Sequence, residues 1–275
     1  MITRREFLQD GVLVTGGLAA GKLLIDGLTP VTSHAAQVDA NDPGLTSSEI
    51  KYPSNDGTAI GGYLTRPKDD SQRPAILVIH AREGINNHVR DVARRLAKAG
   101  YAALAPDLLS RQGGTTSFSS SEAAIAAGQN LDDEMITKDL TAGINYLKGQ
   151  SFVRANRIGV IGFCWGGGKA LLFTTRSKDL SASVIYYGSN PANLDDVKNI
   201  SAPVLGQYGG ADERITSAVP NLEEAMKKYG KSFEYKIYPG APHAFNSDVS
   251  PSYREAAAKE AWSRTLEFFN AHLQS

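Results

Sequence analysis

The sequence feature that most constrains the fold is an alternation of short apolar runs with amphipathic segments along most of the chain. The run from Ala75 to Ile79 is continuous and rich in β-branched residues, as in strands buried on both faces. We therefore predict an α/β fold, one mostly parallel central sheet with helices on both faces. The expected strands are residues 60–64, 75–79, 101–105, 157–162, 183–187, 203–208 and 233–238, and the expected helices lie near 89–97, 140–147, 165 onward, 219–229 and 258–273.

The chain is expected to hold one domain, residues 37–275, behind a leader of residues 1–36. The polar stretch 37–48 is interpreted as a tether, and the Gly-, Ser- and Thr-rich stretch 110–121 as a mobile loop. No internal repeat or second apolar core is visible in the remaining sequence. About 239 residues in one such domain bury enough surface for independent stability.

The N-terminus carries the features of an export signal. The pair Arg4-Arg5 is followed by Phe7-Leu8 and then by an uncharged stretch from Gly11 to Gly21. That stretch is too short to span a bilayer but suits a signal-peptide core, and small residues up to Ala36 offer a cleavage site. The segment resembles a twin-arginine leader, which implies the twin-arginine translocation machinery as a partner and a periplasmic or extracellular location. The alternative is an amphipathic helix of the domain itself.

Charge and cysteine content narrow the function classes. The 275 residues carry 29 Lys+Arg against 29 Asp+Glu, so no basic excess favours a nucleic-acid partner. A single cysteine excludes an intramolecular disulfide and the cysteine-rich zinc sites. We expect no metal and no cofactor, and His80, His88 and His272 are scattered without ligand spacing. The expected ligand is a small molecule.

A predicted strand runs directly into Gly162-Phe163-Cys164-Trp165-Gly166 and then into a predicted helix. This is the pattern of a nucleophile elbow, with cysteine where serine is commoner. The turn crowds the backbone and places the side chain at a helix N-terminus, where the dipole favours a thiolate. The Trp165 N–H then supplies half of an oxyanion hole. The alternative is a structural cysteine beside a glycine-rich packing site.

Two further residues follow predicted strands in the order that a catalytic triad requires. Asp212 follows the strand 203–208, and His243 lies in the loop after the strand 233–238. Taken alone, the aspartate could cap a helix and the histidine could be an ordinary loop residue. Together with Cys164 they give the nucleophile–acid–histidine order of an α/β-hydrolase.

These motifs resemble the dienelactone hydrolase (carboxymethylenebutenolidase) family of α/β-hydrolases. The similarity rests on Gly-Phe-Cys-Trp-Gly-Gly-Gly, Tyr-Gly-Gly-Ala-Asp and Pro-His-Ala-Phe, and covers about residues 51–273. It implies opening of an enol-lactone or ester by a Cys-His-Asp triad through a thioester. In this interpretation Cys164 is the nucleophile, His243 the base and acid, and Asp212 the residue that orients His243. The resemblance also implies the backbone N–H of Arg82 as second oxyanion donor.

The chain departs from the family pattern at the substrate-binding positions. Ala81 stands where the family has a glutamate that regulates the thiol, and Glu83 is the candidate to replace it. Ser247 occupies the place of one arginine that grips the substrate carboxylate, and residues 112–137 lack the other.

The nearest basic candidates for that role are Arg82 and Arg111, and Phe245 is a further candidate for substrate binding. Other functions on the same fold remain open. These are a broad carboxylesterase or thioesterase, a catalytically silent binding protein, and a redox-active thiol at Cys164. The sequence fits a monomer or a small homo-oligomer.

Overall fold

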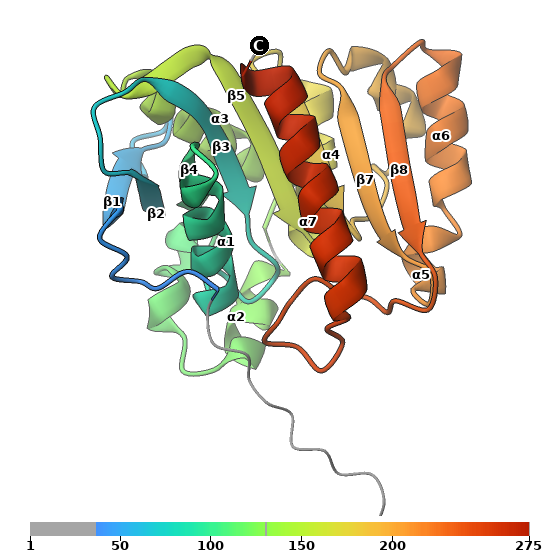
Figure 1. Ribbon diagram of the computed structural model, residues 1–275, viewed down its shortest axis with the longest axis horizontal. Coiled ribbons are helices and arrows are strands. Elements are labelled where there is room, and N and C mark those ends of the chain that lie inside the picture. Colours follow the sequence, from blue (N-terminus) through green and yellow to red (C-terminus); the bar gives the residue numbers. More distant parts are fainter. Residues whose placement is uncertain (1–36, 130, 275) are drawn as a thin grey trace, which may run out of the picture. The chain divides into compact units, whose positions relative to one another are not determined.

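One eight-stranded sheet organises the computed structural model, which describes residues 37–129 and 131–274 (Figure 1). The predicted leader, residues 1–36, lies outside the described residues. Neighbours from β4 to β8 are parallel, whereas β2 is antiparallel to both β1 and β4. In spatial order the strands are β1 (Leu45–Pro53), β2 (Ala59–Pro67), β4 (Ala102–Pro106), β3 (Arg73–Ile79), β5 (Val153–Phe163), β6 (Ala182–Tyr186), β7 (Val204–Gly209) and β8 (Phe233–Tyr238).

Helices cover both faces of this sheet, as the sequence predicted. On one face lie α1 (Asn87–Lys98) and α7 (Glu255–Phe269), in front of the sheet in Figure 1. The other face packs against α3 (Asp133–Lys148), α4 (Trp165–Arg176) and α6 (Val219–Lys228). The remaining elements are short: α2 (Ser121–Gly128), α5 (Glu213–Thr216), the 3-10 turns η1 (Ser110–Gln112), η2 (Thr115–Ser117) and η3 (Leu194–Asn199), and the π-helical turn η4 (Asn270–Gln274).

The central strands are buried because helices cover them on both sides. Every residue of β3, β4, β6 and β7 is buried, which explains why their sequences are mostly apolar. The α/β-hydrolase fold predicted from the sequence is therefore confirmed. None of the helices in residues 37–129 and 131–274 is long and apolar enough to cross a membrane.

One predicted boundary was wrong. The stretch 37–48 was expected to be a tether, yet β1 begins at Leu45 and pairs in antiparallel register with β2. This strand lies at the edge of the sheet and most of its residues stay exposed or half-exposed, so its sequence is polar and lacks the apolar run of a central strand. The expected loop 110–121 contains η1 and η2 and leads into α2.

The parallel strands set the position of the candidate site. Cys164 directly follows β5, Asp212 comes three residues after β7, and His243 lies in the loop after β8. Carboxyl ends of parallel strands meet at one edge of a sheet, where ligands bind in open α/β folds. The topology therefore brings three segments that are distant in sequence to one edge.

Candidate active site

Cys164 sits in a sharp turn between β5 and α4. Its backbone adopts φ 56° and ψ −121°, and its N–H donates to the Tyr186 carbonyl at 3.1 Å. The glycines on either side are required by close backbone contacts. A Cβ at Gly162 would lie 2.1 Å from the Gly166 carbonyl oxygen, and one at Gly166 would lie 2.2 Å from the carbonyl oxygen of His80. The Gly-x-Cys-x-Gly pattern thus follows from the turn that presents the thiol.

Backbone strain is concentrated around this thiol. Among the described residues, the only non-glycine positions with positive φ are Cys164 (56°), Tyr187 (40°) and Ala244 (62°). Tyr187 follows β6 and lines the same cleft as the thiol, and Ala244 adjoins His243. Such conformations cost on the order of 1–3 kcal/mol each and persist where surrounding structure enforces them. Their clustering indicates that the fold is organised to hold this site.

A continuous chain of hydrogen-bonding atoms joins the three residues predicted as a triad. His243 Nε2 lies 3.0 Å from Cys164 Sγ, and His243 Nδ1 lies 2.5 Å from Asp212 Oδ2. Asp212 is buried, whereas the imidazole of His243 remains partly exposed. The hydrogen bond with Cys164, followed by the one with Asp212, raises the pKa of His243 above its ordinary value of 6.5 against the opposing effect of burial. The carboxylate thus orients the ring toward the sulfur.

The thiol and imidazole open into a small cleft of about 150 Å³. Larger hollows, of about 340, 430, 210 and 420 Å³, lie away from these three residues, so the chemistry of its lining rather than its size identifies the cleft. Tyr187 forms a wall, with its ring centroid 5.0 Å from that of His243. The lining residues are Arg82, Cys164, Trp165, Tyr187, Ser189, Arg214, Ile215 and His243.

Two backbone N–H groups are available beside the sulfur. Trp165 is the first residue of α4, and no side chain caps that helix. The first N–H groups of a helix have no partner within it, so the Trp165 N–H is free for a ligand. Arg82 lies in the loop after β3 and also lines the cleft. Neither N–H has a hydrogen-bond partner among the described residues.

The cleft also holds an arginine that the sequence analysis missed. Arg214 belongs to α5 and follows Asp212 by two residues, so its closeness to the triad aspartate was the available signal. Its side chain and that of Arg82 are exposed at the cleft. Neither forms an ion pair with any residue in the described part of the chain. Two arginines without an ion pair to a described residue therefore line the same cleft as the thiol.

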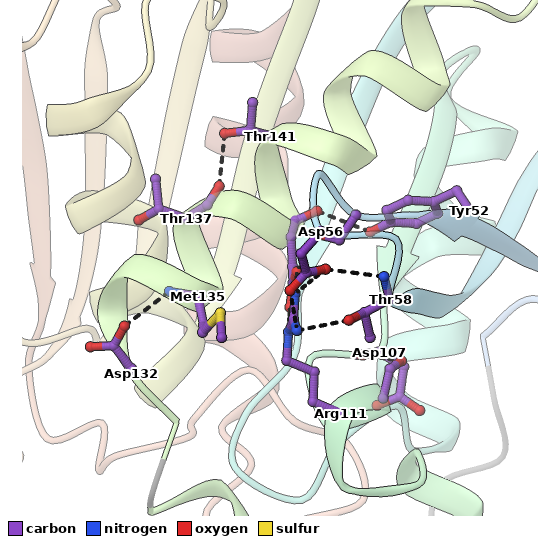
Figure 2. A network of polar contacts seen from close by, with 12 residues as sticks. Tyr52, Asp56, Thr58, Asp107, Arg111, Asp132, Met135, Thr137 and Thr141 are labelled. Atoms are coloured by element: carbon purple, nitrogen blue, oxygen red, sulfur yellow. Dashed lines mark hydrogen bonds and ion pairs between the residues drawn. The ribbon is translucent and has the colours of Figure 1, made fainter.

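Arg111, which was predicted to bind substrate, lies elsewhere, and this expectation is corrected. Figure 2 shows its side chain extending toward Asp56 and Thr58. It also donates two hydrogen bonds to Asp139, at 2.9 and 2.8 Å. Its guanidinium is thus occupied by two carboxylates and a hydroxyl and does not line the cleft. Its neighbours come from the β1–β2 turn and from α3, which the sequence did not place beside it.

Two further predictions for substrate binding also change. Phe245 is fully buried and packs against Tyr187 and Tyr238, so it supports the cleft wall from behind rather than lining it. Glu83 is half-buried and does not line the cleft. Burial lowers the pKa of His80 and raises that of Tyr187; the negative charge of Glu83 opposes the first effect and adds to the second. No group of three or more His, Cys, Asp or Glu side chains within residues 37–129 and 131–274 is arranged to hold a metal ion.

The strand order, the elbow after β5 and the acid and histidine after β7 and β8 define an α/β-hydrolase. The profile of the Dienelactone hydrolase family matches residues 60–273. The chain therefore belongs to the dienelactone hydrolase family.

Relatives and solved structures agree with this assignment. A "Putative carboxymethylenebutenolidase" from Methylorubrum extorquens is 35% identical over 277 residues, covering 96% of this chain and 94% of that protein. A "Probable 2-oxo-3-(5-oxofuran-2-ylidene)propanoate lactonase" from Bradyrhizobium is 38% identical, covering 77% of this chain and 89% of that protein. The crystal structure of a "Putative Dienelactone Hydrolase" from Klebsiella pneumoniae aligns with TM-score 0.76 and 32% identity, covering 82% of this chain and 98% of that chain. The chain is a dienelactone hydrolase-like hydrolase.

Proposed function

We propose that this protein opens an enol-lactone or a related ester through a thioester intermediate on Cys164. The observation that carries the proposal is the unbroken contact chain from Cys164 Sγ through His243 to Asp212 at the mouth of a cleft. A nucleophile, a base and a residue that orients the base, each within hydrogen-bond reach of the next, form the arrangement needed for acyl transfer.

In the first half of the reaction, His243 Nε2 holds the thiol proton while Cys164 Sγ bonds to the carbonyl carbon. The carbonyl π electrons move onto its oxygen, which accepts hydrogen bonds from the N–H groups of Trp165 and Arg82. Each such donor contributes roughly 3 kcal/mol by comparison with other oxyanion holes. When the carbonyl re-forms, the ring C–O bond breaks and the leaving oxygen takes the proton from His243. The product is an open-chain acyl group on sulfur.

The second half returns the enzyme to its starting state. A water molecule gives a proton to His243 Nε2 as its oxygen bonds to the thioester carbon. Collapse of this intermediate breaks the C–S bond, and the sulfur of Cys164 recovers the proton. The net reaction adds one water to the lactone and consumes no other reactant.

The charge of the cleft supports a substrate that carries a carboxylate. Arg82 and Arg214 line the cleft that holds the sulfur, and neither is neutralised by an ion pair with a described residue. Arginine recognises carboxylates with two parallel hydrogen bonds, which fixes orientation as well as affinity. These two side chains supply the cationic groups absent at Ser247 and in residues 112–137. The lactonase from Bradyrhizobium is named for a propanoate substrate that carries such a group.

The proposal is tested by following loss of a dienelactone by ultraviolet absorbance, using the purified full chain. Cys164→Ala serves as the blank, and Cys164→Ser tests whether an oxygen replaces the sulfur. Turnover that disappears in the blank supports the triad. If the wild type hydrolyses simple aryl esters but not lactones, a broad carboxylesterase is the better description.

Two other outcomes contradict the proposal. Absence of turnover on lactones, aryl esters and thioesters, together with slow alkylation of Cys164, would favour a binding protein. Peroxide consumption with a stable sulfenate at Cys164 would favour a redox role instead.

We also propose that the protein is exported by the twin-arginine pathway. The support is the sequence Arg4-Arg5 followed by Phe7-Leu8 and a weakly apolar stretch. Cell fractionation of the full chain should place the protein outside the cytoplasm, and replacing both arginines with lysine should retain it inside. Equal distribution of the two forms would contradict this proposal.

A further inference from the structure

The loop after β3 carries one of the two proposed oxyanion donors, the N–H of Arg82. The direction of this N–H depends on one peptide unit, between Ala81 and Arg82. The carbonyl of Ala81 and the N–H of Arg82 belong to the same planar, trans peptide, so they point in opposite directions. Fixing the Ala81 carbonyl therefore fixes where the Arg82 N–H points. The Gly84 N–H already donates to this carbonyl at 3.2 Å, which closes the loop into a turn.

A buried histidine also contacts this carbonyl. His80 is fully buried, and its Nδ1 lies 2.5 Å from the Ala81 carbonyl oxygen. Its Nε2 lies 3.0 Å from the backbone nitrogen of Leu108. A backbone N–H can only donate, so Nε2 must accept, and the ring proton must be on Nδ1. His80 is thus a neutral imidazole that donates to the Ala81 carbonyl, and burial lowers its pKa accordingly.

The far end of the same loop is held by a threonine. Thr115 Oγ1 accepts the N–H of Ile85 at 3.0 Å and donates to Asp107 Oδ1 at 2.9 Å. The other carboxylate oxygen of Asp107 accepts the Thr115 N–H at 2.7 Å. Gly84 has φ +84°, and a Cβ there would lie 2.1 Å from Thr115 Oγ1. The loop is therefore fitted closely against the threonine hydroxyl.

The side chains of His80 and Thr115, which hold this loop, are both bonded to the segment that directly follows β4. Leu108 holds the ring of His80, and Asp107 holds Thr115. The ring of His80 also stacks on Trp165, whose N–H is the other oxyanion donor, with centroids 6.1 Å apart. We propose that His80 and Thr115 are positioning residues that aim the Arg82 N–H at the developing oxyanion. This inference rests on the proposed acyl-transfer function.

A purely structural role would make a different prediction. If these contacts only stabilised the fold, their loss would lower the melting temperature and reduce every reaction of Cys164 in parallel. A positioning role instead lowers kcat for hydrolysis, because the donor acts on charge that develops in the transition state. Alkylation of Cys164 by iodoacetamide creates no oxyanion, so its rate should stay unchanged.

The histidine is tested in the full chain with the pair His80→Asn and His80→Gln. Asparagine places an amide N–H near the position of Nδ1, whereas glutamine places its amide near Nε2. We expect His80→Gln to lower kcat roughly 100-fold, the scale of one lost oxyanion donor, with KM within twofold. His80→Asn should recover at least tenfold of that loss. Wild-type kcat in His80→Gln, or parallel loss of hydrolysis and alkylation in both variants, would overturn the inference.

The threonine supplies a second test that does not disturb a buried ring, because Thr115 is half-exposed. Thr115→Val keeps the shape but removes the hydroxyl, and Thr115→Ser restores it. We expect about a tenfold loss of kcat in the valine variant and recovery in the serine variant. Equal kcat in both would contradict a positioning role for the hydroxyl. A wild type without Cys164-dependent turnover would refute the proposed function itself, whereas an active wild type with unaffected variants refutes only this inference.

Discussion

Two polar clusters in this molecule contain similar side chains but differ in how completely they are neutralised. In one, Arg111 forms an ion pair with Asp139. It forms another with Asp56, toward which its side chain extends in Figure 2. In the other, Cys164 and His243 line a cleft that Arg214 also lines, without an ion pair to any described residue. The guanidinium of Arg111 in the first cluster is hydrogen-bonded to side chains of the protein. In the second cluster the guanidinium of Arg214 remains available for a ligand.

The comparison shows that availability, rather than residue type, separates a structural arginine from a binding one. Arg111 is mostly buried, and Asp139 beneath it is only 3% exposed and also accepts from Ser54. A buried charge with all partners in place contributes to the fold and resists rearrangement. An exposed guanidinium in a cleft still has its donors free for a carboxylate.

The largest effect is expected at the sulfur. Cys164→Ala should abolish lactone hydrolysis, a loss on the order of 10⁴-fold or more, because a triad without its nucleophile retains only binding and oxyanion stabilisation. The melting temperature should change little, since alanine keeps the Cβ and the substitution removes only one partly exposed sulfur atom. Steady-state kinetics and thermal unfolding measure the two quantities. Activity within tenfold of the wild type would contradict a nucleophilic role.

The second prediction concerns the structural cluster. Arg111→Ala should lower the free energy of unfolding by about 3 kcal/mol, because it leaves Asp139 buried and without its cation. The value of kcat/KM should stay within twofold, since Arg111 does not line the cleft. Urea unfolding and steady-state kinetics on the same preparation check both. Arg111→Lys is the matched control: it keeps the charge but loses the bidentate fork, so its destabilisation should be intermediate.

The third prediction concerns the arginine of the cleft, where binding rather than stability should change. Arg214→Ala should raise KM for a carboxylate-bearing lactone by roughly ten- to 100-fold, the worth of a hydrogen bond to a charged group, and leave stability unchanged. The methyl ester of the same lactone is the control, because it lacks the negative charge and should be hydrolysed equally well by both forms. A loss of stability in Arg214→Ala with an unchanged KM would reverse the proposed division between the clusters.

The smallest effect concerns the ionisation of His243. Its pKa is raised, with the hydrogen bond to Cys164 as the largest cause, so NMR titration of the imidazole should show a midpoint above 6.5. Because the pKa of His243 is raised in the folded state, protonation of this residue stabilises the fold, fully so below pH 6.5. This contribution is lost as the pH rises through the folded-state pKa. In Cys164→Ala the midpoint should fall and this pH dependence should weaken. A midpoint unaffected by the substitution would show that the hydrogen bond is not the cause.

The sequence predicted best what depends on local patterns and strand order. Continuous apolar runs identified the central strands, and the rule that sites lie at strand ends selected Cys164, Asp212 and His243, which the structure brings together. The edge strand β1 was missed because it is largely exposed and its polar sequence resembles a loop.

The substrate side was harder to predict for a different reason. Whether a charged side chain is free depends on partners far away in sequence, such as Asp139 for Arg111, and no local pattern records them. Arg214 was overlooked although it lies two residues from Asp212, because the family pattern places its substrate-binding arginines at the positions of Ser247 and of residues 112–137. Phe245 is aromatic, as many pocket residues are, but its side chain is fully buried in the core.

The central claim, acyl transfer through Cys164, is tested most directly by trapping the thioester. The Asp212→Asn variant is suited to this, because water needs a general base more than a thiol does, so deacylation should slow more than acylation. The variant is mixed with the lactone, quenched in acid during the first turnover, digested and analysed by mass spectrometry. The account predicts the mass of the opened lactone on the peptide that contains Cys164, rising and then decaying. Hydrolysis without that adduct, or with the adduct on another residue, would contradict it.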